Sequence, residues 1–126
     1  MQAGGIPLGL MITELKTPHL GALLEAAGID FAVFDMEHGT YSYESVAGMI
    51  AGFRGTSVTP FVRIPEIRKE CITKALDSGA HGILAPGVET VEQAEACVRY
   101  ARYAPLGERG ISLLKPHTDF RRPERV

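Results

Sequence analysis

The chain has 126 residues, of which 45% are hydrophobic and 22% charged, and its formal net charge at pH 7 is -2. This composition is typical of one folded globular domain and excludes a chain that is disordered or fibrous as a whole. No run of about 18 apolar residues is present, which excludes an ordinary transmembrane helix. Dispersed Lys and Arg residues argue against a nucleic-acid partner. Because the start of the chain lacks a basic stretch followed by an apolar one, we expect a cytoplasmic protein.

Apolar runs and helical patterns alternate along the first half of the chain. An apolar run at residues 6–12 predicts a strand, and Thr17-Pro18 then provides an N-cap and a first helical position. The helix that follows should end at Gly28, because glycine is common just after a helix. A second apolar run at residues 30–36 and a helical pattern at about 42–53 complete the next strand–helix unit.

The same alternation continues in the second half. Residues 59–64 predict a third strand and residues 67–77 a third helix, and residues 82–86 predict a short fourth strand. A fourth helix should begin at Thr90, where Gln93 completes a capping box. The apolar residues of this helix that we expect to face inward are Val91, Ala94, Cys97, Val98 and Ala101.

Four successive strand–helix units, with strands that are apolar throughout, predict a parallel sheet covered by helices. The units recur about every 22 to 29 residues, close to the spacing of a (β/α)8 barrel, which needs roughly 250 residues. We therefore expect an α/β fold that is a (β/α)4 half of a TIM-type barrel over residues 1–111, with residues 112–126 as a loop or disordered tail. A small doubly wound sheet is the alternative, although no glycine-rich nucleotide fingerprint supports it.

Candidate functional residues follow the second and third predicted strands, because chemistry in parallel α/β proteins is located at the carboxyl ends of strands. The second strand ends in Asp35-Met36-Glu37-His38-Gly39. His38 can act as a general base near neutral pH, and the two carboxylates are close enough in sequence to orient it or raise its pKa. Arg63, near the end of the third strand, can stabilise a developing oxyanion. The alternatives are a solvated histidine and a surface salt bridge of Arg63 with Glu37 or Glu66.

Four segments resemble one enzyme family, the class II 2-oxo acid aldolases of the HpcH/HpaI aldolase/citrate lyase type. Residues 28–39 (GIDFAVFDMEHG) resemble its second strand and residues 59–65 (TPFVRIP) its third. Residues 76–86 (LDSGAHGILAP) are similar to the fourth strand, and residues 102–110 (RYAPLGERG) to the loop after the fourth helix. The motifs occur in the family's order and cover about residues 8–111, so the chain resembles the N-terminal half of such an enzyme.

The resemblance implies a reversible aldol cleavage of a 4-hydroxy-2-oxo acid to pyruvate and an aldehyde, with Mg²⁺ or Mn²⁺ holding the enolate. His38 matches the base that removes the proton of the aldol hydroxyl, and Arg63 matches the arginine that stabilises the enolate oxygen. Asp77, whose spacing alone indicates a cap at the end of the third helix, matches the carboxylate that raises the basicity of the histidine. Asp35 and Glu37 are implied as supporting groups in the same pocket.

The sequence departs from the family pattern in its metal site. The metal-binding Glu and Asp of the family lie on later strands, and nothing after Ile111 resembles them, so we expect the metal ligands to lie beyond this chain. An open sheet leaves an apolar edge, which soluble proteins avoid. Besides a small 2-oxo acid substrate, we therefore expect a homo-oligomer or a complementary half-barrel as partner.

Two interpretations of function remain open from the sequence. The chain is either part of an aldolase-type lyase or a non-catalytic half-barrel, truncated or an assembly subunit, that retains a relic pocket. A lyase acting on an acyl-CoA thioester is a third hypothesis, which no residue pattern for CoA supports.

Overall fold

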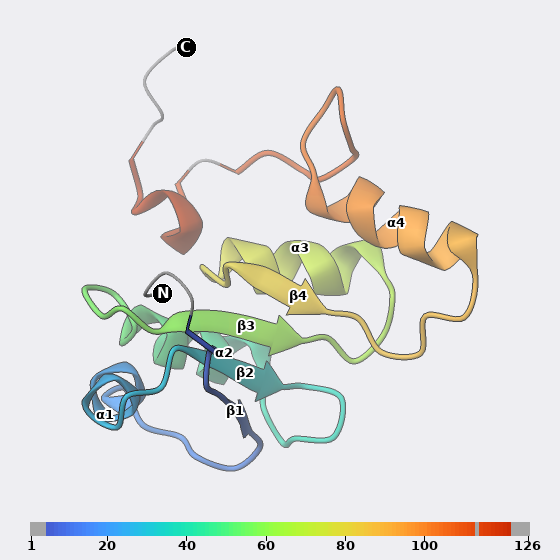
Figure 1. Cartoon of the computed structure of the whole chain (residues 1–126). Coiled ribbons are helices and arrows are strands. Elements are labelled where there is room, and N and C mark those ends of the chain that lie inside the picture. The colour runs from blue at the N-terminus through green and yellow to red at the C-terminus, as the bar shows by residue number, and fades with distance from the viewer. Residues whose placement is uncertain (1–4, 113, 122–126) are drawn as a thin grey trace.

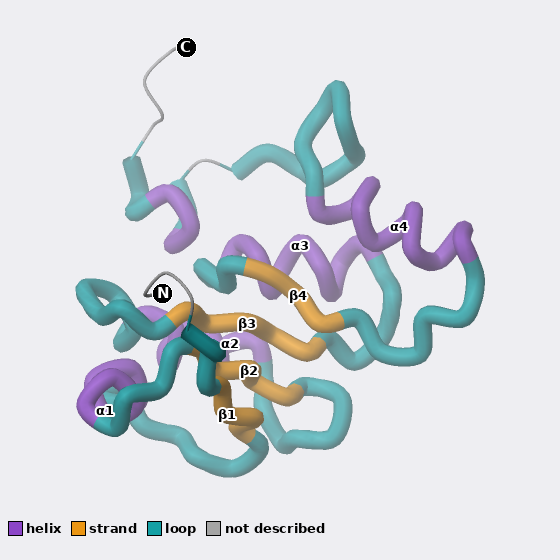
Figure 2. Tube along the Cα trace, viewed as in Figure 1, coloured by secondary structure: helices purple, strands orange, loops and turns teal. Residues whose placement is uncertain are grey.

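The computed structural model describes residues 5–112 and 114–121, and strands and helices alternate along them (Figures 1 and 2). In this part of the chain, no helix is long and apolar enough to cross a membrane. The elements are β1 (Gly9–Ile12), α1 (Leu20–Ala26), β2 (Phe31–Asp35), α2 (Tyr43–Ala51), β3 (Thr59–Arg63), α3 (Lys69–Asp77), β4 (Gly82–Leu84), α4 (Val91–Ala101) and the short 3₁₀ helix η1 (Pro116–Thr118).

The strands form one parallel sheet in the order β1-β2-β3-β4 (Figure 1). Sequential order is typical of a singly wound barrel, whereas a doubly wound sheet reverses its order at a switch point. Because all strands run in the same direction, their carboxyl ends meet at one edge of the sheet. The parallel sheet predicted from the apolar runs is therefore confirmed, and its strand order agrees with the half-barrel.

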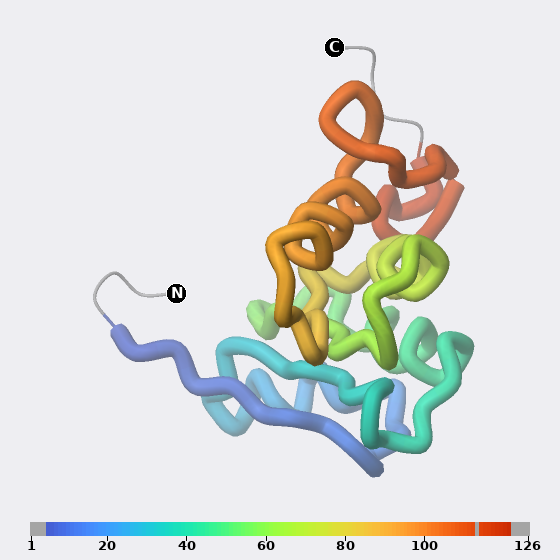
Figure 3. Tube along the Cα trace, turned by 90° about the vertical axis from the view of Figure 1, so that its right-hand side faces the viewer, coloured from blue at the N-terminus to red at the C-terminus, as the bar shows by residue number. Residues whose placement is uncertain are grey.

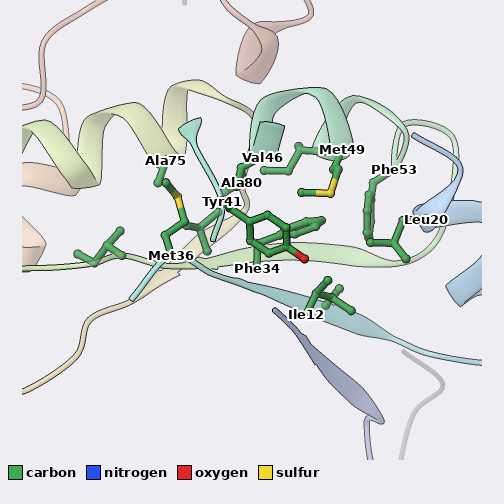
Figure 4. Close-up of a cluster of buried hydrophobic side chains, with 14 of the residues drawn as sticks. Ile12, Leu20, Phe34, Met36, Tyr41, Val46, Met49, Phe53, Ala75 and Ala80 are labelled. Atoms are coloured by element: carbon green, nitrogen blue, oxygen red, sulfur yellow. The ribbon is translucent and has the colours of Figure 1, made fainter. Parts of the chain in front are cut away.

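The hydrophobic core lies between one face of the sheet and the helices (Figure 4). Phe34 of β2 is fully buried at its centre, and its ring makes edge-to-face contacts with Phe53 and Tyr41 at centroid distances of 5.6 and 6.3 Å. Alternate strand residues point to this face because successive side chains of a strand point to opposite sides. The other buried residues of the core include Ile12, Leu20, Val46, Met49, Val62, Ile64, Cys71, Ile72 and Ala75.

Of the four α-helices in the described part of the chain, two begin at a side-chain cap, whereas α1 and α3 have none. Ser42 caps α2 in a capping box with Ser45, and Thr90 caps α4 with Gln93 as predicted. The expected N-cap at Thr17 is wrong, because α1 begins at Leu20 with His19 as its N-cap. The backbone N–H of Leu20 donates to the carbonyl of Thr17, so a turn precedes the helix.

The inward face predicted for α4 is only partly correct. Cys97 and Ala101 pack against the core, but Val91 is 69% exposed and Val98 54%, and Ala94 is exposed as well. The helix packs against α3 on one side, and it has no fully buried residue. Periodicity predicts which side of α4 is apolar. Which elements pack against that side depends on the tertiary structure.

The segment after α4 returns to the half-barrel near the end of α2. The Arg54 guanidinium donates to the carbonyl of Pro116 at 2.8 Å and pairs with Asp119 at 3.1 Å. Of the tail expected at residues 112–126, residues 113 and 122–126 lie outside the described residues. Residues 114–121 contain η1, which contacts α3.

Candidate active site

Asp35 is the last residue of β2, and its side chain is 1% exposed. Its Oδ1 atom accepts the backbone N–H groups of Glu37 at 3.0 Å and His38 at 3.2 Å. This pattern is an Asx-type turn, in which the carboxylate replaces backbone acceptors where the strand ends. Asp35 thereby folds the following residues back over the edge of the sheet.

Arg63 occupies the position next to Asp35 on the neighbouring strand β3. Its Nε donates to Asp35 Oδ1 at 2.8 Å and its Nη2 to Asp35 Oδ2 at 2.6 Å, which is a two-pronged, charge-assisted pair. These hydrogen bonds hold the pKa of Asp35 at about 2 and raise the pKa of Arg63. Both groups therefore stay charged at neutral pH, and the guanidinium plane is held in one orientation.

Glu37 and His38 extend this arrangement toward solvent. Glu37 Oε2 lies 3.3 Å from Arg63 Nη1 and 3.7 Å from His38 Nε2. The His38 side chain is 72% exposed, while that of Arg63 is only 22% exposed. The sheet edge thus presents an accessible imidazole and a constrained guanidinium, joined by one carboxylate. The structure brings together four of the five residues singled out from the sequence.

Gly39 makes this tight turn sterically possible. A side-chain Cβ at this position would collide with the backbone carbonyl oxygen of Asp35 and would lie 3.1 Å from that of Thr13. The glycine after His38 therefore lets the loop approach the strand end closely. The position of Gly39 directly after His38 predicts a turn from the sequence alone. Only the fold shows that the carbonyl oxygens of Asp35 and Thr13 both lie close to this glycine.

Asp77 is not brought to His38, contrary to what the resemblance implies. It is the last residue of α3, which runs back from the carboxyl edge of the sheet, so it lies toward the amino ends of the strands. There its Oδ1 accepts from Arg109 Nη2 at 2.6 Å and lies 3.8 Å from His117 Nδ1. Arg109 and His117 were not singled out from the sequence, because they are distant from Asp77 along the chain. The cap interpretation is not supported either, since the carboxylate pairs with these side chains.

The residues at the sheet edge do not by themselves fit a divalent metal. Asp35 and Glu37 supply oxygen atoms of the kind that Mg²⁺ and Mn²⁺ prefer, but both carboxylates face the Arg63 guanidinium. Over residues 5–112 and 114–121, no group of three or more His, Cys, Asp or Glu side chains is placed to hold an ion. This part of the chain therefore places an imidazole and an arginine at the sheet edge, without a ligand set for a metal ion.

Comparison with known proteins relates this geometry to aldolases. The chain is 35% identical over 115 residues to 4-hydroxy-2-oxovalerate aldolase of Novosphingobium aromaticivorans, covering 88% of this chain and 42% of that protein. It is 35% identical over 101 residues to 5-keto-4-deoxy-D-glucarate aldolase of Escherichia coli (strain K12 / DH10B), covering 80% and 40% of the two chains. The chain thus spans less than half the length of the relatives that it matches.

The fold agrees with these sequence matches. The crystal structure of an HpcH/HpaI aldolase from Desulfitobacterium hafniense DCB-2 superposes with a TM-score of 0.89 at 32% identity, covering 97% of this chain and 47% of that one. The expected TIM-type barrel architecture is confirmed by this likeness. The profile of the HpcH/HpaI aldolase/citrate lyase family matches residues 10–120. The chain therefore belongs to the HpcH/HpaI aldolase/citrate lyase family.

Proposed function

We propose that this chain supplies the base and the arginine of a pyruvate aldolase site, which cleaves a 4-hydroxy-2-oxo acid reversibly to pyruvate and an aldehyde. The observation that carries the proposal is the Arg63 guanidinium held by Asp35 beside the exposed imidazole of His38, at the carboxyl edge of a parallel sheet. Relatives named as aldolases support the same class of reaction.

In this proposal, His38 acts as the general base. Its exposed imidazole removes the proton of the substrate's 4-hydroxyl group, the bond between C3 and C4 breaks, and the aldehyde leaves. The electron pair of the broken bond remains on the three-carbon fragment as the pyruvate enolate. Proton return to C3 then yields pyruvate, so that atoms and charges balance.

Arg63 stabilises the negative charge that develops on the enolate oxygen. Its Nε and one Nη2 hydrogen are committed to Asp35, so its Nη1 side faces Glu37 and the open edge. A donor held in place before the reaction loses no reorganisation energy when the charge appears. Lysine would carry the charge but not the planar fork that Asp35 holds.

The proposed reaction requires a divalent ion, Mg²⁺ or Mn²⁺, which would polarise the keto oxygen of the substrate when bound. The described residues form no ligand set for it. We therefore expect its ligands to come from polypeptide outside the described residues.

The proposal is tested through the half-reaction that needs no aldehyde, the exchange of pyruvate methyl protons in deuterated buffer with Mn²⁺ or Mg²⁺, followed by NMR. We expect exchange above buffer with the chain, and at least a hundredfold slower exchange with His38→Ala. The matched control is His81→Ala, since His81 is also exposed but precedes β4 at the opposite end of the sheet. A folded protein that binds Mn²⁺ or Mg²⁺ but shows no exchange above buffer contradicts the proposal and supports the alternative, a half-barrel with a relic pocket.

A further inference from the structure

The segment that carries His38 is anchored on both sides. Residues 36–42 connect β2 to α2. Before His38, the buried Asp35 carboxylate accepts the backbone N–H groups of Glu37 and His38. After it, the side chain of Tyr41 returns to the core, where the residue is only 7% exposed. The exposed imidazole of His38 therefore lies on a short span of chain between two buried side chains.

Tyr41 fixes this segment to the loop after β1, residues 13–19. Its hydroxyl donates to the backbone carbonyl of Leu15 at 2.9 Å. Its ring packs edge to face against Phe34, which restricts the position of the hydroxyl (Figure 4). The Lys16 ammonium, from the same loop, lies 5.6 Å from the centroid of the Tyr41 ring in a cation–π contact. One buried side chain thus contacts the loop in two ways.

A second contact between the two segments lies directly beside His38. A Cβ on Gly39 would lie 3.1 Å from the carbonyl oxygen of Thr13 and would collide with that of Asp35. Figure 3 shows the loop after β1 and the segment after β2 side by side at one end of the sheet. A displacement of the loop would therefore displace the backbone next to His38, because no side chain separates them.

The Tyr41 hydroxyl is suited to hold a position and not to exchange a proton. Burial raises the pKa of Tyr41 above its ordinary value, and the negative charges of Glu14 and Asp35 raise it further. The hydroxyl therefore remains a hydrogen-bond donor at neutral pH. Its acceptor is a backbone carbonyl, which does not titrate there. The contact with Leu15 thus persists at the pH values where a histidine changes its charge.

We propose that Tyr41 is a positioning residue for His38, because its hydroxyl fixes the loop after β1 against residues 37–40 and thereby holds the imidazole near Arg63. The inference rests on the proposed function, in which the base and the arginine must face one substrate. Glu37 Oε2 lies 3.7 Å from His38 Nε2 and 3.3 Å from Arg63 Nη1. A shift of residues 37–40 would change this arrangement, since Arg63 lies on β3 and would not move with them. A misplacement of about 1 Å can slow a reaction by about a hundredfold.

Tyr41→Phe tests the inference, because it keeps the ring against Phe34 and removes only the hydroxyl. In the pyruvate exchange assay, we expect the maximal rate to fall about tenfold, because the base is less well aligned. The pyruvate concentration that gives half the maximal rate should change by no more than about twofold, because Arg63 stays in place. Tyr43→Phe is the matched control and should leave the rate unchanged, since the Tyr43 ring faces Lys74 of α3, with Nζ 5.3 Å from its centroid.

Amide hydrogen exchange provides a readout that requires no activity. In Tyr41→Phe, the amides of residues 13–16 and 37–40 should exchange at least about tenfold faster than in the wild type, whereas β2 and β3 should keep their protection. Unchanged exchange in these two segments overturns the inference. A loss of protection that extends through β2 and β3 also overturns it, because the hydroxyl would then stabilise the whole fold and not the position of His38.

The inference and the proposed function fail in different ways. If wild-type protein that binds Mn²⁺ shows no pyruvate exchange, the proposed function fails, and amide hydrogen exchange still decides whether Tyr41 orders the His38 segment. If the wild type is active and Tyr41→Phe keeps its full rate, the positioning role is overturned and the proposed function stands. Equal losses of rate in Tyr41→Phe and Tyr43→Phe also overturn the positioning role, since the effect would not depend on the contact with Leu15.

Discussion

The Asp35 carboxylate performs two structural tasks at the strand end. It accepts two backbone N–H groups of the turn and two N–H groups of Arg63, so its oxygen atoms are well satisfied although it is buried. A buried charge is tolerated only with such partners, because its loss of hydration must be offset. The order of the turn and the orientation of Arg63 therefore depend on the same side chain.

Replacing this carboxylate should be costly for stability. Asp35→Asn removes the buried charge that holds the Arg63 guanidinium from two sides and leaves Glu37 as its charged partner, and we expect the free energy of unfolding at pH 7 to fall by about 3 kcal/mol. Urea denaturation followed by circular dichroism measures the change. The control is Glu66→Gln, which breaks the exposed pair with Arg68 and should change stability by about 0.5 kcal/mol. Equal effects of the two substitutions would contradict the role given to Asp35.

The Asp35–Arg63 pair also predicts that the free energy of unfolding decreases at acid pH. The pKa of Asp35 is about 2 in the folded chain, below its ordinary value near 3.9 in an unfolded one. The pair therefore stabilises the fold fully above that ordinary value, and the contribution, about 2 kcal/mol, is lost as pH falls from about 5 to 2.

The measurement is the difference in unfolding free energy between the wild type and Asp35→Asn at a series of pH values. We expect this difference to shrink as pH falls, because protonation removes from the wild type the charge that the variant already lacks. A difference that stays constant between pH 5 and pH 2 would show that Asp35 keeps an ordinary pKa.

At the scale of elements, α1 and α2 approach each other through glycine. A Cβ on Gly21 of α1 would lie 2.6 Å from the carbonyl oxygen of Gly52, and one on Gly52 would collide with the carbonyl oxygen of Pro18. Backbone atoms cannot move aside as a flexible side chain can. The contact between these helices therefore requires residues without a side chain.

Alanine substitutions test this contact with an internal control. Gly52→Ala should lower the free energy of unfolding by about 3 kcal/mol, because the backbone of one helix must shift. Gly48→Ala lies within α2 with nothing near its Cβ, and it should raise stability by about 0.5 to 1 kcal/mol through helix propensity. Thermal unfolding of the two variants measures whether each substitution lowers or raises stability. Destabilisation by both substitutions would contradict the explanation.

At the scale of the whole molecule, the segment after α4 contacts the first half of the chain through Arg54. The Arg54 guanidinium donates to the carbonyl of Pro116 at 2.8 Å and pairs with Asp119 at 3.1 Å. Because this ion pair is exposed to solvent, we expect Arg54→Ala to lower the free energy of unfolding by only about 1 kcal/mol, which thermal unfolding measures. A loss of several kcal/mol would contradict this expectation.

Much of the fold follows from local rules. The apolar runs and the Thr90–Gln93 capping box predict strands and helices within a few residues, because a buried parallel strand and a helix start each leave a local signature. The same rules place Asp35 and Arg63 at strand ends, and parallel strands bring such ends together. Thr17 was a misleading signal, since a turn competes with the helix start there.

The order of the elements, the parallel sheet and the residues at its carboxyl edge can all be predicted from local patterns in the sequence. The pairing of Asp77 with Arg109 instead of His38 could not be predicted in this way, because a helix that returns across the sheet carries its last residue to the opposite edge. The exposure of Val91 and Val98 could not be predicted either. Periodicity identifies which side of an element is apolar, but the covering surface depends on the elements that pack against it.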